Sequence, residues 1–127
     1  SRANCIAQRA TIAALEAPVS NIQYMIDEFE SRREMVLELL GNIEGFRLNQ
    51  PKGAFYVFPD VSAFFGKTLQ GVTIENASDF ALFLLEKAHV ATVTGEAFGS
   101  PDCIRISYAA SVENLKEAIK RIANAVA

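Results

Sequence analysis

Arg105 is the residue of this sequence best suited to bind an anionic ligand. It lies in the segment 103–109, where large apolar residues alternate with small ones, as in a strand with different surroundings on its two faces. The large face carries Ile104, Ile106 and Tyr108. The other face carries, besides the arginine, Cys103, Ser107 and Ala109. These side chains are small, so they leave space beside the guanidinium for a planar anion. A guanidinium binds a carboxylate through two parallel hydrogen bonds, which an ammonium group cannot form. The segment therefore predicts a carboxylate-binding arginine, with a solvated or locally paired strand arginine as the alternative.

The groups that usually accompany such an arginine in an active site are missing from the sequence. The single histidine, His89, falls at the end of a predicted helix and is interpreted as a last-turn residue. Gly95 and Gly99 have the wrong spacing for a phosphate-binding loop and are interpreted as turn glycines. No cluster of His, Cys or acidic residues has metal-ligand spacing. The sequence thus predicts no catalytic, metal-binding or cofactor-binding residue in this chain, and at most half of an active site.

Composition and length narrow the class of protein. The 127 residues suit one domain with a real core, and 50% of them are hydrophobic. The mean hydropathy of +0.16 is high for such a domain, which indicates a surface that meets other protein. A net charge of −3 argues against nucleic-acid binding. Two cysteines make no disulfide framework, and no apolar run is long enough for a bilayer, so we expect a cytoplasmic protein.

The spacing of apolar residues predicts the elements that would position Arg105. Helices are expected at 4–15, 22–43, 77–88 and 111–126, and strands at 46–49, 54–58, 90–93 and 103–109. A capping box of Ser20 and Gln23 should start the second helix, and the turn 50–53 should join the first two strands into a hairpin. This order predicts an α+β fold: a small, mostly antiparallel sheet of three to four strands covered by helices and preceded by a long interdomain helix.

Three motifs occur in order along the chain. They are GAFYVFPD at 53–60, VTGEAFG at 93–99 and IRISYA at 104–109, the last followed by ENL at 113–115. Together with NCIAQ at 4–8, they resemble the C-terminal small domain of class I/II aminotransferases. These form the aspartate aminotransferase family of fold-type I pyridoxal-phosphate enzymes. The similarity covers essentially all 127 residues, with Thr94 standing where many members of the family have proline.

The resemblance implies a role for two side chains. Arg105 takes the position of the arginine that binds the α-carboxylate of the amino-acid substrate in this family. Phe98 lies in the family's glycine loop near the mouth of the active site, where it either forms a wall of the substrate pocket or packs in the core. The implied reaction is transfer of an amino group between an amino acid and a 2-oxo acid, with this domain closing as a lid over the substrate. Members of this family are cytoplasmic homodimers, so the resemblance implies that the partner of the complete protein is a second copy of itself.

The cofactor of such enzymes, pyridoxal phosphate, is held in this family by residues N-terminal to the segment that this sequence resembles. None of the lysines matches the motif of the cofactor lysine: Lys52, Lys67, Lys87, Lys116 and Lys120. We therefore expect residues 1–127 to be a piece of a longer polypeptide that is inactive alone, with 1–16 forming a helix that packs on the missing large domain. The chain by itself is expected to bind no cofactor. The identity of the amino-acid substrate is left open.

Two other functions fit parts of the sequence. A free-standing amino-acid-binding regulatory module would also use an arginine for a carboxylate, but such modules begin with a strand, whereas this chain begins with two predicted helices. A purely structural or dimerising domain would explain the apolar composition, but it gives Arg105 no role.

Overall fold

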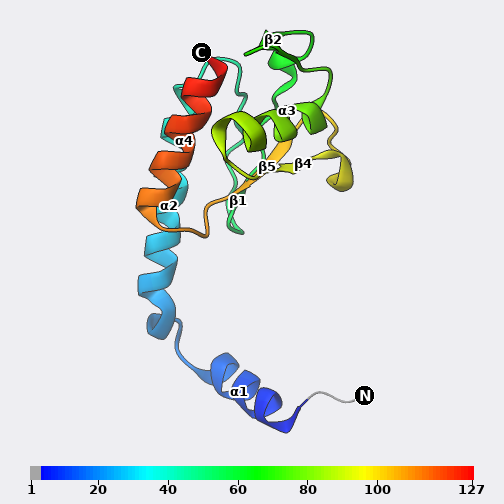
Figure 1. The fold of residues 1–127 in the computed structure, drawn as a ribbon. Coiled ribbons are helices and arrows are strands. Elements are labelled where there is room, and N and C mark those ends of the chain that lie inside the picture. Colours follow the sequence, from blue (N-terminus) through cyan, green and yellow to red (C-terminus); the bar gives the residue numbers. More distant parts are fainter. Residues whose placement is uncertain (1–3) are drawn as a thin grey trace.

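The computed structural model describes residues 4–127 and shows a helix-rich body from which one helix extends (Figure 1). The longer helices are α1 (Cys5–Glu16), α2 (Gln23–Gly41), α3 (Ala77–Phe83) and α4 (Val112–Val126). The strands are β1 (Tyr56–Val57), β2 (Thr68–Leu69), β3 (Val72–Thr73), β4 (Val93–Thr94) and β5 (Ile104–Ser107). Short helical turns lie at η1 (Val19–Ile22), η2 (Ser62–Phe64), η3 (Leu84–Ala88) and η4 (Glu96–Phe98). The predicted α+β class is confirmed.

The sheet that carries Arg105 is antiparallel and has β5 in its centre. The strand order is β1–β5–β4, with Tyr56 opposite Ser107 and Val93 opposite Arg105. Strand β5 is therefore hydrogen-bonded on both sides, whereas β1 and β4 are edge strands. The second sheet is the hairpin β2–β3, which turns at Gln70 and Gly71 with φ values of 48° and 81°. The strands predicted from the sequence leave out 68–73, so this hairpin was not expected.

The predicted hairpin of 46–49 with 54–58 is wrong. Only Arg47 pairs, through an isolated bridge with Asp60 in which each N–H donates to the other carbonyl at 3.0 Å. The segment 54–58 instead takes β5 as its partner, because Tyr108 N–H donates to the Phe55 carbonyl at 2.9 Å and the Tyr56–Val57 pair continues this ladder. The partner of 54–58 is thus the distant strand β5 and not the neighbouring segment 46–49.

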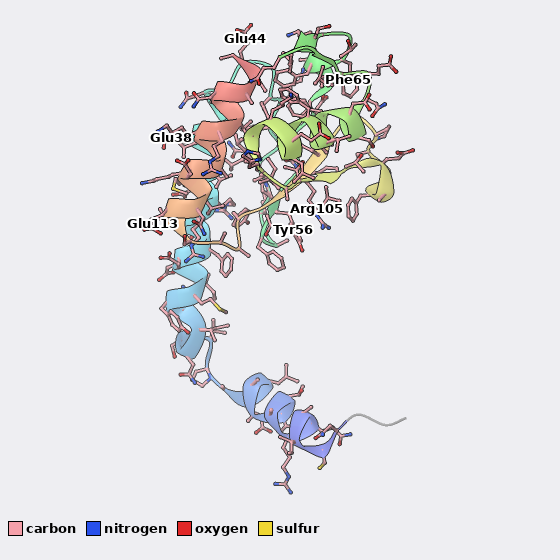
Figure 2. All side chains as sticks on the ribbon, in the orientation of Figure 1. Glu38, Glu44, Tyr56, Phe65, Arg105 and Glu113 are labelled. Carbon is pink, nitrogen blue, oxygen red and sulfur yellow. The ribbon has the colours of Figure 1, made fainter. Side chains whose placement is uncertain are left out.

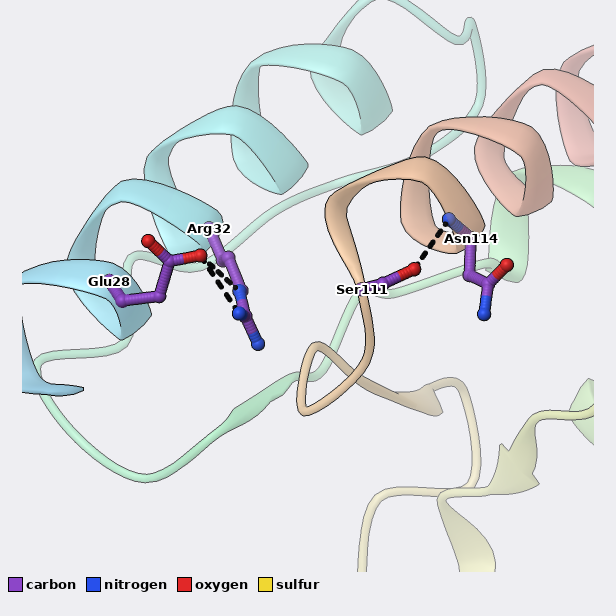
Figure 3. Close-up of polar contacts among 4 residues, drawn as sticks. All are labelled: Glu28, Arg32, Ser111 and Asn114. Atoms are coloured by element: carbon purple, nitrogen blue, oxygen red, sulfur yellow. Dashed lines mark hydrogen bonds and ion pairs between the residues drawn. The ribbon is translucent and has the colours of Figure 1, made fainter.

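The long helix α2 does not start with a capping box. Ser20 lies within the turn η1 after Pro18, and no side chain caps either η1 or α2. The side chain of Gln23 instead donates to Asp27 Oδ1 at 2.8 Å, one turn further along the helix. The helix is reinforced on its surface by an ion pair in which Arg32 Nη2 lies 2.8 Å from Glu28 Oε1 (Figure 3).

The core lies between the sheet and the helices α2, α3 and α4. Helix α4 starts where predicted, because the Ser111 side chain accepts from the Asn114 N–H at 3.2 Å (Figure 3), and it packs against α2 and η3. Phe64 and Phe80 stack with their ring centroids 4.7 Å apart, and Phe46 meets Phe80 edge-on at 6.0 Å. Across residues 4–127 the helices are too short or too polar to cross a lipid bilayer.

Helix α1 lies apart from this core (Figure 1). Asn4 caps its start by accepting from the Ile6 N–H at 2.8 Å, and none of its residues is buried. The helix matches the segment predicted at 1–16, of which residues 1–3 fall outside the described part. Its large apolar side chains are exposed, including Ile6, Ile12 and Leu15.

Candidate carboxylate-binding site

The two faces of β5 have the surroundings that the alternating sequence predicted. Ile104, Ile106 and Tyr108 are buried in the core, at 0%, 9% and 2% exposure. Arg105 lies on the opposite face and is half-buried, and Ser107 beside it is exposed. Figure 2 shows Arg105 and Tyr56 together on the side of the body toward which α1 extends. The strand thus separates a packed face from a face that carries one guanidinium.

The guanidinium of Arg105 contacts two aromatic rings from different elements. Its Cζ carbon lies 4.5 Å from the ring centroid of Tyr56, in β1, and 4.5 Å from that of Phe98, in η4. A cation this close to the face of an aromatic ring is attracted by the ring quadrupole. The rings cover the guanidinium without using its N–H donors, so the donors stay available for an anion.

Arg105 has no acidic partner within residues 4–127. The ion pairs there involve Arg32, Arg33, Arg47 and Arg121, each held by a neighbouring carboxylate. Within residues 4–127, the Arg105 side chain also takes part in no hydrogen bond. The locally paired arginine that sequence analysis left open is therefore not what the structure shows. A half-buried cation without a counter-charge favours an incoming anion.

Phe98 is placed beside Arg105 and not in the core. It is 51% exposed, and its ring also meets that of Phe58 edge-on at a centroid distance of 6.1 Å. The turn η4 that presents it is closed by hydrogen bonds from Phe98 N–H and Ser100 N–H to the Gly95 carbonyl, at 2.8 and 3.1 Å. The loop therefore presents the ring at the surface next to the guanidinium.

Gly95 fixes this loop because its α-carbon lies against the backbone of Cys103 and the side chain of Phe58. A Cβ at this position would come within 2.6 Å of the Cys103 carbonyl oxygen and 2.9 Å of the Phe58 ring. Gly95→Ala should destabilise the fold by about 1–3 kcal/mol, because the loop must shift to accommodate the methyl group. Urea unfolding measures this. Gly53→Ala is the matched control, since a Cβ there meets nothing within 4 Å, and we expect a change within about 0.5 kcal/mol. Equal costs for the two variants would contradict the prediction.

Tyr108 supports the site from the packed side. Its hydroxyl donates to the Ala54 carbonyl at 2.8 Å. Ala54 has a φ of 60°, in the left-handed region, and it leads directly into β1. The sequence predicted the turn before this strand at 50–53, but the residue with the left-handed backbone is Ala54, one position later. The tyrosine thus holds the turn that sets the position of Tyr56.

Cys103 and Cys5 differ in their surroundings. Burial raises the pKa of the Cys103 thiol above its usual range, and the negative charges of Asp60 and Asp102 add to this. Cys5 is exposed on α1. Because the thiolate is the reactive form, we expect iodoacetamide at pH 8 to alkylate Cys5 before Cys103, with the gap narrowing as the pH rises. Mass spectrometry of the two peptides gives the order, and faster labelling of Cys103 would contradict the assignment.

The single histidine and the lysines are exposed. His89 ends the turn η3 with a left-handed φ of 55°, as the last-turn residue that sequence analysis expected, and it is exposed. All five lysines are exposed. A lysine that forms a Schiff base is normally activated by desolvation or a neighbouring cation, so these lysines do not fit the role. Within 4–127, no three His, Cys, Asp or Glu side chains gather as a metal site would require.

Tyr56 is the site residue that sequence analysis missed. The alternation of 54–58 places Tyr56 and Phe58 on one face of a strand, and this signal was available. Whether these side chains lie beside Arg105 depends on the pairing of β1 with β5. The sequence predicted a different partner for this strand, so the contact was not expected.

Comparison with known proteins identifies the family. A family model described as "Aminotransferase class I and II" matches residues 4–122. The bifunctional aspartate aminotransferase and glutamate/aspartate-prephenate aminotransferase of Petunia hybrida is 41% identical, over 99% of this chain and 27% of its own length. The aspartate aminotransferase of Rhizobium meliloti strain 1021 is 44% identical, over 94% of this chain and 30% of its own.

Solved structures agree with the sequence comparisons. The crystal structure of the Rhizobium meliloti aspartate aminotransferase matches with a TM-score of 0.90 at 42% identity, over 95% of this chain and 30% of that one. Alanine aminotransferase from Pyrococcus furiosus matches with a TM-score of 0.83 at 30% identity, over 95% of this chain and 29% of that one. The chain spans less than a third of the length of these relatives. It belongs to the class I and II aminotransferase family.

Proposed function

We propose that this chain is the C-terminal small domain of a pyridoxal-phosphate-dependent aminotransferase, and that Arg105 binds the α-carboxylate of the substrate. The observation that carries the proposal is the half-buried guanidinium of Arg105, which is held against two aromatic rings and has no acidic partner in residues 4–127. The complete enzyme transfers an amino group between an amino acid and a 2-oxo acid. Relatives named as aspartate aminotransferases make aspartate the first substrate to test.

The chemistry of this chain is binding and orientation. Arg105 neutralises the carboxylate and fixes two of its oxygens through its forked donors. Phe98 forms an apolar wall beside the bound substrate and helps to exclude water from the ion pair, which strengthens it. Since none of the lysines fits the cofactor, the residues that hold pyridoxal phosphate and move protons lie on polypeptide outside this chain.

The exposed apolar side chains of α1, of the turn η1 and of the start of α2 form the surface on which we place the large domain. Its side chains include Ile6, Ile12, Leu15, Ile22 and Met25, all at least 42% exposed. Exposure of these apolar side chains to water is unfavourable, and packing them against the large domain would remove them from water and stabilise the protein. Helix α2 then connects the large domain to the body that carries Arg105, as a closing lid requires. The complete enzyme is expected to be a cytoplasmic homodimer.

The experiment that tests the function compares this chain with the full-length enzyme. We expect the full-length enzyme to transfer the amino group of L-aspartate to 2-oxoglutarate, and residues 1–127 alone to show no turnover. With pyridoxal phosphate added, the chain alone should form no borohydride-reducible adduct on a single lysine. A specific adduct, or a full-length enzyme without amino transfer from any amino acid, would overturn the proposal.

The alternative, a free-standing amino-acid-binding module, shares the unpaired Arg105 and is separated by calorimetry. Such a module should bind an amino acid with micromolar affinity as residues 1–127 alone. The aminotransferase domain contributes one carboxylate contact and some apolar surface, so it should bind L-aspartate or L-alanine no more tightly than millimolar.

A further inference from the structure

Tyr56 lies on the same face of the sheet as Arg105 because of the register between β1 and β5. Tyr56 is directly opposite Ser107, and Ser107 is two residues from Arg105 along β5. Side chains two residues apart in a strand point to the same face, so Tyr56 and Arg105 are diagonal neighbours. Figure 2 shows the two side chains together.

The ring of Tyr56, and not its hydroxyl, makes the contact. The Arg105 Cζ carbon is 4.5 Å from the ring centroid, and the ring also packs against Phe55, the residue before β1, with a centroid separation of 4.5 Å. Within residues 4–127 the Tyr56 hydroxyl takes part in none of the hydrogen bonds, in contrast to Tyr108, whose hydroxyl is bonded to Ala54. Whatever Tyr56 contributes through this contact should therefore survive removal of the hydroxyl.

An arginine side chain has many rotamers, and binding a carboxylate bidentately requires one of them. A ring that attracts the guanidinium restricts it before the ligand arrives, so less conformational freedom is lost on binding. Phe98 contributes a second ring, but it comes from the short turn η4 and is 51% exposed. Tyr56 is half-buried and belongs to a strand of the same sheet. Its ring is therefore the more firmly placed of the two.

We propose that Tyr56 is a positioning residue that orients the Arg105 guanidinium for the substrate carboxylate. The proposal rests on the function proposed above for Arg105. A carboxylate that stays bound throughout the reaction contributes equally to the ground state and the transition state. Loss of orientation should therefore raise KM and leave kcat nearly unchanged.

The test is a set of variants in the full-length enzyme, assayed with L-aspartate and with succinate as a competing carboxylate that lacks an amino group. Tyr56→Leu should raise KM for L-aspartate and the inhibition constant of succinate by about three- to tenfold, with kcat within about twofold. Tyr56→Phe, which keeps the ring, should stay within about twofold of the unmodified enzyme in both constants. Tyr56→Met, which fills the same space without a ring, should behave as Tyr56→Leu and replaces it if the leucine variant does not fold.

A second background tells a positioning role from a structural one. In an Arg105→Leu enzyme, Tyr56→Leu should add less than about twofold to either constant, because there is no guanidinium left to orient. A Tyr56→Leu effect that persists in that background, a Tyr56→Phe variant as impaired as Tyr56→Leu, or a fall in kcat at unchanged KM would each overturn the proposal. If Arg105→Leu itself leaves KM unchanged, the role proposed for Arg105 fails. If Arg105→Leu raises KM and Tyr56→Leu does not, only the role of Tyr56 fails.

Discussion

Arg105→Lys in the full-length enzyme is expected to lower kcat/KM for amino acids and 2-oxo acids. The loss should correspond to about 2–5 kcal/mol of transition-state stabilisation, the cost of disturbing a desolvated charge pair. Lysine keeps the positive charge, but it loses the planar fork that meets both oxygens of a carboxylate. It also replaces a flat cation that fits against the rings of Tyr56 and Phe98 with a compact, strongly hydrated ammonium group. Steady-state kinetics with varied amino-acid and 2-oxo-acid concentrations measures the effect.

Arg47→Lys is the matched control for this substitution. Arg47 is also next to a strand, but its side chain is 73% exposed and lies 3.8 Å from Asp60 in a surface ion pair. Such pairs contribute about 0–1 kcal/mol, so this variant should keep both its kinetics and its stability. If Arg105→Lys proved as harmless as Arg47→Lys, Arg105 would not be the carboxylate-binding residue.

Phe80→Ala is expected to reduce the free energy of unfolding by about 3–5 kcal/mol, which is a large part of the stability of a domain of this size. Phe80 is 0% exposed, and it joins α3 to the rest of the core by stacking on Phe64 and meeting Phe46 edge-on. Removing the ring leaves a cavity that these neighbours fill only in part. Urea unfolding followed by circular dichroism gives the free energy.

Leu82→Ala provides the comparison within the same helix. Leu82 is 54% exposed on the outer side of α3, so its truncation should change the free energy of unfolding by no more than about 1 kcal/mol. The two substitutions share the helix and the replacing residue, and they differ mainly in burial. If both cost the same, the core would not be centred on the aromatic cluster around Phe80.

The elements with long, regular patterns could be predicted from sequence. Helix α4 combines a serine cap with apolar residues at intervals of three and four, and β5 alternates without interruption. Both signals are local, and the packed structure agrees with them. The start of α2 shows the opposite case. A serine cap requires extended backbone at Ser20, but the chain forms the turn η1 directly after Pro18, so the cap geometry is lost.

The sheet was harder to predict because its strands are short and their partners are distant. Strand β1 has two residues, and its partners in β5 are 49 and 51 positions away. Periodicity gives the face of each residue but not the identity of the neighbouring strand. The position of Arg105 on an open face followed from β5 alone. The contact with Tyr56 required the pairing, so only the structure reveals it.

The central place of β5 has a mechanical consequence. Its backbone is bonded to β1 on one edge and to β4 on the other, and its inner side chains are locked into the core. The α-carbon of Arg105 therefore has little freedom of its own. Under the function proposed above, a carboxylate bound to this guanidinium would be coupled through β5 to the rest of the body, so that substrate binding and the proposed lid closure would occur together.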